Sequence, residues 1–456
     1  MLIEFTVGNF RSFHEPITFS MVAAPLVSVN KKLDEDNVVK ISDDLSLLAS
    51  AAIYGANASG KSNLLKAMSA MNRLVRQSAT KLEDGDILPM IQPFRLSTQS
   101  EGEPTLFQMV FLLKGKQFRY GFRVDEKRVV SEWLFMTRTT KETQLFLREN
   151  GHIKVNERSF REGKGLEDKT RANALFLSVV AQFNGRIAKE VTSWFRCSNI
   201  VSGLADNQHI GYTLHCIESG NNKSEVEELI RSLDVSINKF RLQRTSKTVS
   251  QDEQDIRGET SENLTTEATT EAAPKMAPVR VETFHPKYNA KGERVEDEVL
   301  SLALHASEGT RKLFAFAGPL VNTLKYGTRL IIDEMDARLH PLITCAIIKL
   351  FHSKATNPRG AQLIFVTHDT NLLSNRNFRR DQIWFAEKDS RGATHLYSLA
   401  ELKVRNDALF ETDYIKGRYG AIPFLGDIES IFDAFDVESG HSATNDQSHP
   451  LEVAHG

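Results

Sequence analysis

The stretch GANASGKS, residues 55–62, has the residue types and spacing of a loop that wraps around phosphates. Its glycines let the backbone curl tightly, so that several N–H groups point into one concavity. In the pattern G-x-x-x-x-G-K-S, the ammonium group of Lys61 contacts the β- and γ-phosphates of a nucleotide, and the hydroxyl of Ser62 holds Mg²⁺. The predicted nucleotide-binding residues here are Gly55, Asn57, Ser59, Gly60, Lys61, Ser62 and Asn63.

The metal needs a further ligand, and an apolar run in the second half of the chain supplies one. In RLIIDE, the apolar residues 330–332 precede Asp333 and Glu334. At the carboxyl end of such a strand, Asp333 would hold Mg²⁺ through water, and Glu334 would polarise the attacking water as a general base. Because two acids often end a strand in solvent, this interpretation depends on the presence of the phosphate loop.

Two more stretches could contact the terminal phosphate. His368 follows the apolar run LIFV, where its ring could reach the γ-phosphate and sense its loss. SEGT, residues 307–310, looks like a helix N-terminus, whose exposed amides bind anions. A structural histidine and a simple helix cap are the ordinary alternatives. The βαβ spacing from the Asp-Glu strand favours a functional role for His368.

These residues require an α/β fold in which parallel strands end at one edge. An apolar strand runs into the phosphate loop, and residues 61–78 carry apolar side chains at helical spacing. RLIIDEMD and AQLIFVTHD, separated by a segment of helix length, indicate a βαβ unit with parallel strands. Residues 104–150 alternate like β-hairpins, with one turn at residues 114–116, and two helical segments follow.

The order of these segments predicts five regions. Residues 1–100 form an N-terminal lobe with the phosphate loop, 101–242 a β-rich and helical insertion, and 279–426 a C-terminal lobe with the other motifs. Residues 243–278 are rich in Thr, Glu and Ser, and they lack the apolar surface that would offset the entropy of ordering. We therefore expect them to be a flexible loop, and residues 427–456 to be a polar tail.

Composition narrows the class of protein. The chain has 456 residues, 41% of them apolar, and a net charge of −2, which allows a large core but gives no general basic field for nucleic acid. Its 3 cysteines are far apart, which favours a reducing cytoplasm over a disulfide framework or a zinc cluster. The start resembles a strand and not a signal peptide, and no apolar run reaches membrane length, so we expect a cytoplasmic protein without membrane contacts.

The motifs follow one another in the order of a known group. With its phosphate loop, long insertion, SEGT loop, Asp-Glu strand and histidine, the chain resembles the ABC-type ATPase heads of the SMC/RecF group. The opening NFRSF is similar to the N-terminal strand turn of that group, which adds Arg11 to the nucleotide-binding residues. More narrowly, ASEGTRKLF, IIDEMDARLHP, QLIFVTHDTNLL and GRYGAIPFL resemble AAA15 or RloA-like proteins, including AriA-like ATPase subunits, an overcoming-lysogenization-type (OLD-like) branch of prokaryotic defence loci.

This resemblance implies an ABC-type P-loop ATPase head with a β-rich lobe and a helical insertion. It implies Mg²⁺-dependent hydrolysis of ATP in a homodimer or higher homo-oligomer that sandwiches the nucleotide. ATP held by the phosphate loop of one subunit would be capped by Ser307 and Gly309 of the other, while Glu334 and His368 act as catalytic residues. The signature departs from the usual LSGGQ because Glu308 replaces a small residue, which leaves the nucleotide-dependent affinity of the dimer open.

The resemblance also implies a glutamine that reaches Mg²⁺ from the insertion. Gln182 in VVAQFN and Gln92 in MIQPF are both candidates. We assign Gln182 as a metal ligand beside Ser62 and Asp333, and Gln92 remains the alternative.

The resemblance favours an ATPase sensor of an anti-phage defence system that controls a separate effector, a nuclease or a toxin. OLD nucleases carry a large C-terminal nuclease domain, whereas only about 88 residues follow His368 here. The alternative is a RecF-like DNA-repair or DNA-clamping ATPase, with DNA bound at Lys114, Lys116, Arg119 and Arg123 of one predicted hairpin. A module that binds nucleotide without hydrolysis is disfavoured by the intact catalytic residues, and a transporter subunit by the long β-rich insertion.

Overall fold

The structure is a computed structural model. It describes residues 1–423 apart from 84, 87, 89, 139, 205, 221, 234–236, 238 and 245–278. Nearly all of the predicted loop 243–278 and the whole predicted tail 427–456 therefore lie outside the described residues.

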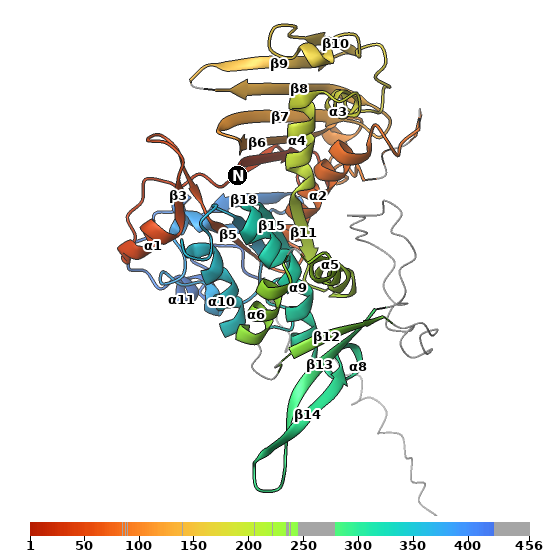
Figure 1. The fold of residues 1–456 in the computed structure, drawn as a ribbon. Coiled ribbons are helices and arrows are strands. Elements are labelled where there is room, and N and C mark those ends of the chain that lie inside the picture. Colours follow the sequence, from red (N-terminus) through yellow and green to blue (C-terminus); the bar gives the residue numbers. More distant parts are fainter. Residues whose placement is uncertain are drawn as a thin grey trace, which may run out of the picture.

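Two large sheets dominate the described part of the chain (Figure 1). The first is antiparallel and seven-stranded, in the order β10-β9-β8-β7-β6-β1-β2. Its strands are β1 (Leu2–Gly8), β2 (Ile17–Ser20), β6 (Thr105–Leu113), β7 (Lys116–Val124), β8 (Val129–Thr137), β9 (Glu142–Glu149) and β10 (His152–Val155). The predicted hairpin is confirmed, since β6 and β7 pair up to Leu113 and Lys116 on either side of the turn.

The second sheet has six strands in the order β11-β15-β16-β5-β17-β18. They are β5 (Ser50–Tyr54), β11 (Ser198–Ser202), β15 (Arg329–Asp333), β16 (Gln362–Val366), β17 (Ile383–Lys388) and β18 (Thr394–Ser398). All neighbours are parallel except β17 and β18, so the predicted βαβ unit of β15 and β16 is confirmed. The strands that precede the phosphate loop, the Asp-Glu pair and His368 are adjacent, and therefore end at one edge.

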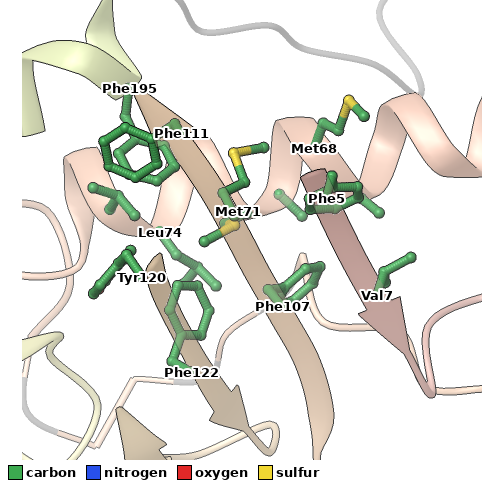
Figure 2. Close-up of a cluster of buried hydrophobic side chains, with 14 of the residues drawn as sticks. Phe5, Val7, Met68, Met71, Leu74, Phe107, Phe111, Tyr120, Phe122 and Phe195 are labelled. Atoms are coloured by element: carbon green, nitrogen blue, oxygen red, sulfur yellow. The ribbon is translucent and has the colours of Figure 1, made fainter. Parts of the chain in front are cut away.

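Helix α2 (Lys61–Gln77) lies between the two sheets. Its buried side chains recur at helical spacing, as predicted, and join one core with both sheets. Figure 2 shows Met68, Met71 and Leu74 of this helix against Phe107 and Phe122 of the seven-stranded sheet. The other face of α2 meets side chains such as Ile53 and Ile331 of the six-stranded sheet. The helix that begins at the phosphate loop is thus fixed along its length.

A second core covers the opposite face of the six-stranded sheet. It contains alternate residues of β5, β15 and β16 together with apolar residues of α9 (Glu308–Tyr326) and α10 (Pro341–His352). Buried on both faces, these strands read as continuous apolar runs, which is typical of a parallel sheet. The remaining helices are α1 (Lys31–Asp36), α3 (Phe176–Gln182), α4 (Arg186–Arg196), α5 (Asp206–Glu218), α6 (Lys223–Leu233), α8 (Leu302–His305) and α11 (Phe410–Ile415).

The first of the two helical segments predicted after residue 150 forms two helices, α3 and α4, and not one. Asn184 between them has a φ of 68°, a left-handed conformation that ends a helix. Short 3-10 helices connect other elements: η1 (Thr98–Ser100), η2 (Arg161–Gly163), η3 (Thr370–Leu372), η4 (Arg380–Gln382) and η5 (Leu399–Glu401).

Two small sheets complete the described fold. Strands β3 (Val38–Lys40) and β4 (Ser46–Leu48) pair with each other within the first hundred residues. Strands β12 (Lys239–Arg244), β13 (Val279–Tyr288) and β14 (Arg294–Ser301) form a ribbon that projects away from the two large sheets (Figure 1). Its base meets α9, where the rings of Phe240 and Phe314 pack edge to face.

The two large sheets do not follow the sequence order of the predicted regions. β1 and β2 from the first hundred residues pair with the sheet of β6 to β10, whereas β5 joins strands from the second half. No helix among the described residues is long and apolar enough to cross a bilayer.

Candidate nucleotide-binding site

The phosphate loop is shaped by the two glycines of its G-x-x-x-x-G-K-S pattern, Gly55 and Gly60, and by the packing around them. β5 ends at Tyr54 with every residue buried, and Gly60 caps α2 in the left-handed region with a φ of 107°. A Cβ atom on Gly60 would lie 2.2 Å from Thr394 Oγ1, and one on Gly55 would lie 2.3 Å from the carbonyl oxygen of Ala386. Only glycine fits these positions, because both backbone and neighbours exclude a side chain.

Three polar side chains from distant parts of the chain clamp the loop. Thr394 at the start of β18 places its hydroxyl 2.8 Å from Ser12 Oγ and donates to the Ser59 carbonyl at 2.8 Å. Asn63 in the first turn of α2 donates to the same Ser12 hydroxyl at 2.8 Å. The N-terminal turn, the phosphate loop and β18 therefore hold one another in register.

Lys61 lies inside the loop that it would complete. Its ammonium group donates to the carbonyl oxygens of Gly55 at 2.8 Å and Ala56 at 2.7 Å. Burial lowers the pKa of Lys61 to about 8, even though the negative charges of Asp333, Glu334 and Asp336 raise it. A desolvated ammonium ion of this kind gains strongly from an anion, which fits a phosphate ligand.

Ser62 and Asp333 meet although 271 positions separate them in the chain: the Ser62 hydroxyl donates to Asp333 Oδ1 at 3.0 Å. Burial raises the pKa of Asp333, and the hydrogen bond from Ser62 and the charges of Lys66 and Lys61 oppose that rise. A hydroxyl and a carboxylate together are the oxygen ligands that Mg²⁺ takes beside nucleotide phosphates. The pair therefore fits Mg²⁺, as the sequence predicts. No cluster of three or more His, Cys, Asp or Glu side chains forms a further metal site within the described residues.

Glu334 and His368 lie at the same edge of the sheet. Glu334 has a φ of 52°, so the chain turns sharply directly after β15. The His368 amide donates to Asp336 Oδ1 at 3.3 Å, which joins the ends of β15 and β16. Burial and the charge of Lys61 lower the pKa of His368, while Asp336, Glu334 and Asp333 raise it. These mutual electrostatic effects place both predicted catalytic residues in the field of the phosphate loop.

Arg11, a predicted nucleotide-binding residue, lies near helix α2. Its amide donates to the Gln92 carbonyl at 2.7 Å, and its φ is 52°. The guanidinium Nε is buried without a hydrogen-bond partner among the described residues. After burial, the charge of Arg11 is the second factor that lowers the pKa of Lys66 in α2. A buried guanidinium Nε without a hydrogen-bond partner in the described part of the chain fits the predicted role of Arg11 at the nucleotide.

The structure does not bring Gln182 to the metal ligands. It is exposed at the end of α3, and Ser178 of that helix donates to the Val75 carbonyl near the far end of α2. Val75 is 13 residues beyond Ser62, about 20 Å along a helix axis. Glu132 of β8 accepts from the Phe176 and Leu177 amides and so anchors the start of α3 there. Gln92, the alternative, is held next to Arg11 through its backbone.

Ser307 and Gly309 form a separate surface. Ser307 caps α9, as predicted for a helix N-terminus, and its hydroxyl accepts from the Thr310 amide at 3.1 Å. Both residues line a cavity of about 640 Å³ whose wall also includes His285, Arg338 and His340. Their contacts lie within this wall and not at the phosphate loop of the same chain.

Several site residues carry no signal in the sequence. Ser12 and Thr394 are ordinary hydroxyl residues until folding brings them together, and Lys312 looks like a surface residue of a helix although it is 0% exposed. Gly203 fits tightly, because a Cβ atom there would lie 2.1 Å from the Glu334 carbonyl oxygen. The sequence offers a hint for Lys312 alone: it lies four residues before Phe316, so helical periodicity puts both on the buried face of α9.

The comparisons with known proteins agree with this geometry. A family model described as "AAA domain, putative AbiEii toxin, Type IV TA system" matches residues 50–374, which is more than half of the chain. The chain belongs to this AAA-domain family. The matched range contains the phosphate loop, Ser307, Asp333, Glu334 and His368.

Among solved structures, the SMC head domain from Thermotoga maritima is similar at 12% sequence identity and a TM-score of 0.38. The alignment covers 88% of this chain and 99% of that one. No curated protein matches. With the strand order and the composite site, membership of the AAA-domain family identifies an α/β P-loop ATPase head of ABC type, as the sequence predicts.

Proposed function

We propose that this chain binds and hydrolyses ATP with Mg²⁺, and that ATP closes two copies into a dimer that controls a separate effector in a prokaryotic defence system. The proposal places the protein in the cytoplasm. The ATPase part depends on the site, whereas the defence part depends on the family and on the motif resemblance.

The observation that carries the proposal is the contact between Ser62 and Asp333 at 3.0 Å. It joins the end of the phosphate loop to the end of β15, where Glu334 follows directly. A chance Gly-Ser loop would not meet a carboxylate with the spacing of a metal ligand pair. The charge of Lys61 lowers the pKa of His368 and the charge of Glu334 raises it, which supports a single reaction centre at this edge.

Each residue has a role in hydrolysis. Lys61 and the loop amides would hold the β- and γ-phosphates, and Arg11 would add positive charge on the other side. Mg²⁺ held by Ser62 and Asp333 would neutralise charge that develops on the phosphates. Glu334 would take a proton from the water whose oxygen attacks the γ-phosphorus, while the bond to the bridging oxygen breaks and ADP leaves. His368 would contact the γ-phosphate and report its release.

The position of Ser307 supports a dimer. This helix N-terminus is exposed, and its own contacts lie in the cavity wall around Arg338 and His340. Amides at the start of a long helix favour an anion, so the γ-phosphate bound to another copy is a suitable ligand. Such an arrangement completes each site only when two chains meet.

The defence role draws on the family description, which names a putative toxin of a type IV toxin–antitoxin system. Toxin–antitoxin loci pair two gene products, which agrees with a separate effector. We assign the regulatory ATPase to this chain because its recognisable chemistry is that of a nucleotide switch.

The ATPase part is tested by phosphate release with Mg-ATP from the wild type, Lys61→Ala and Glu334→Gln. We expect Lys61→Ala to lose ATP binding, and Glu334→Gln to bind ATP but hydrolyse it roughly 100-fold more slowly or worse. Arg405→Gln, which alters an exposed ion pair with Asp407, is the matched control. A wild type that releases no phosphate, or a Glu334→Gln variant with normal turnover, overturns this part.

The effector part is tested by expressing the chain with and without the product of the neighbouring gene during phage infection. Protection that needs both proteins, and that disappears with Lys61→Ala, supports a controlling ATPase. Growth arrest caused by this chain alone would assign the toxicity to it and remove the separate effector from the proposal.

DNA clamping has weaker support. Of the four cations on the predicted hairpin, Lys114 pairs with Glu190 at 2.9 Å and Arg119 with Glu142 at 2.6 Å. Pairing reduces the positive potential that a DNA backbone needs. ATP-dependent binding of duplex DNA that weakens steeply with salt would restore this alternative.

A further inference from the structure

Lys312 is a fully buried cation in the second turn of α9, directly behind the SEGT turn. Its ammonium group donates to the carbonyl oxygen of Glu334 at 3.3 Å and to that of Ala337. It also lies 5.2 Å from the centre of the Phe316 ring. Burial of an ammonium ion is costly, so a chain keeps one where its hydrogen bonds fix something.

What these bonds fix is the loop of residues 333–339, which carries the predicted general base. Glu334 and Arg338 have φ values of 52° and 62°, a region that residues with side chains occupy only when surroundings hold them there. The Ala337 amide donates to the Glu334 carbonyl at 3.2 Å, so the loop folds into a tight turn. Lys312 contacts both carbonyl oxygens of that turn from beneath, and its loss would remove the donor that keeps the turn closed.

The same loop packs against the first turn of α9. A Cβ atom on Gly309 would lie 3.1 Å from the carbonyl oxygen of Arg338, and Arg338 pairs with Glu308 at 3.4 Å. The Gly203 amide donates to the Asp333 carbonyl at 2.7 Å from the opposite side. The loop is therefore held between the end of β11 and the first turns of α9. Lys312 provides the charged hydrogen-bond donor among these contacts.

We propose that Lys312 is a positioning residue for ATP hydrolysis: it holds the backbone of Glu334 in the conformation that presents the general base, and it ties that backbone to the turn bearing Ser307. This inference rests on the proposed ATPase activity. In the proposed dimer, Glu334 acts on the ATP bound by its own chain, and Ser307 of the same chain caps the ATP bound by the other copy. Lys312 would then couple the general base of one site to the cap of the second site.

The test compares Lys312→Met, Lys312→Arg and a control, Lys325→Met, in the full chain. Methionine keeps the length and apolar stem but removes the donors. We expect kcat for ATP to fall about 10- to 100-fold while the KM for ATP and the affinity for a fluorescent ATP analogue stay within about twofold. Arginine keeps the charge and some donors, so Lys312→Arg should lose less. Lys325, on the same helix and paired with Glu225 at 2.8 Å, should give wild-type kinetics as Lys325→Met.

Hydrogen exchange supplies a readout that a general loss of stability would not reproduce. In Lys312→Met, the amides of Ala337 and Leu339 in the loop should exchange faster, while the amides of β16 keep wild-type protection. Acceleration across the whole six-stranded sheet would instead indicate a structural role and overturn the inference.

The outcomes separate this inference from the proposed function. A wild type without ATP hydrolysis rejects the proposed function itself. A wild type that hydrolyses ATP, together with Lys312 variants of unchanged kcat, rejects only the positioning role. If Lys312→Met does not bind the ATP analogue, the result for Lys312→Arg is used in its place. A lowered kcat of Lys312→Arg with retained ATP binding supports the positioning role, and an unchanged kcat contradicts it.

Discussion

The phosphate loop and the first turn of α9 both present a helix N-terminus, but the chain encloses only the first of them. The loop is enclosed by Ser12 and Thr394, and its lysine already meets carbonyl oxygens. Ser307 is exposed and faces a cavity with contacts to its own turn. In the proposed dimer, this difference divides the site into a half that binds ATP and a half that recognises ATP held by another copy.

The largest effect is expected from adding one methyl group to the phosphate loop and, in a second variant, one to the first turn of α9. Gly60→Ala should abolish ATP binding, because the backbone there has a φ of 107° and the methyl would lie 2.2 Å from Thr394 Oγ1. Gly309→Ala meets only a 3.1 Å contact, so the variant should bind ATP normally and lose part of its hydrolysis. Titration with a fluorescent ATP analogue and a phosphate-release assay measure the two effects. Equal binding losses in both variants would contradict the division.

Mixing two inactive chains sharpens the comparison. Lys61→Ala breaks the binding half, and Ser307→Arg should break the recognition half through its bulk and through the loss of the cap. In a mixed dimer, one site carries both defects and the other carries neither. An equimolar mixture should therefore recover roughly a quarter of wild-type hydrolysis if chains pair at random.

The control for this experiment is each variant assayed alone at the same total concentration. If the mixture stays as inactive as the separate variants, while native mass shows that mixed dimers form, then one chain does not complete the site of the other.

The binding half should also respond to pH through Lys61. Its pKa is about 8 without ligand, and bound phosphate raises it, so ATP binding takes up a proton at higher pH. The affinity should be full below pH 8 and should fall as pH rises, by up to about tenfold per unit. Calorimetry in two buffers measures the proton uptake. Lys61→Arg, which stays charged, should lose this dependence, and an unchanged profile would assign the titration to another group.

The smallest expected effect concerns the clamp around the loop. Thr394→Val keeps the shape but removes hydrogen bonds to Ser12 and the Ser59 carbonyl. We expect a loss of about 1 kcal/mol in ATP affinity, roughly fivefold. Thr356→Val, which removes an exposed hydroxyl bonded to the Leu350 carbonyl, is the control and should bind ATP like the wild type. A stronger effect of the control would indicate that the assay reports general stability.

The sequence predicts the binding half well because its signals are local. β5, the glycines and the apolar face of α2 lie within thirty residues, and the β15 and β16 runs are buried on both faces. The placement of Asp333, Glu334 and His368 at strand ends follows from this pattern. Their side-by-side arrangement then needs only the parallel order of strands.

The rest depends on contacts between distant segments. Ser12 and Thr394 are 382 positions apart, and no periodicity connects them. Gln182 fails to reach the metal ligands because contacts with distant residues fix α3 at the far end of α2: Ser178 donates to the Val75 carbonyl, and the Phe176 and Leu177 amides donate to Glu132. Helical periodicity puts Lys312 on the buried face of α9, but the sequence does not show the carbonyl oxygens that its ammonium group needs there, because only the folded loop presents them.

The burial of α2 between two sheets has a mechanical consequence. This helix begins at Lys61 and extends for 17 residues, about 25 Å. Side chains such as Met71 and Leu74 are packed on the seven-stranded sheet, so the helix can shift only together with that sheet (Figure 2). If bound phosphate displaces the loop, the whole of α2 therefore has to move with it. Because α2 also packs on Ile53 and Ile331 of the six-stranded sheet, both sheets would have to follow such a shift, including the outer strands β9 and β10 at the rim of the molecule in Figure 1.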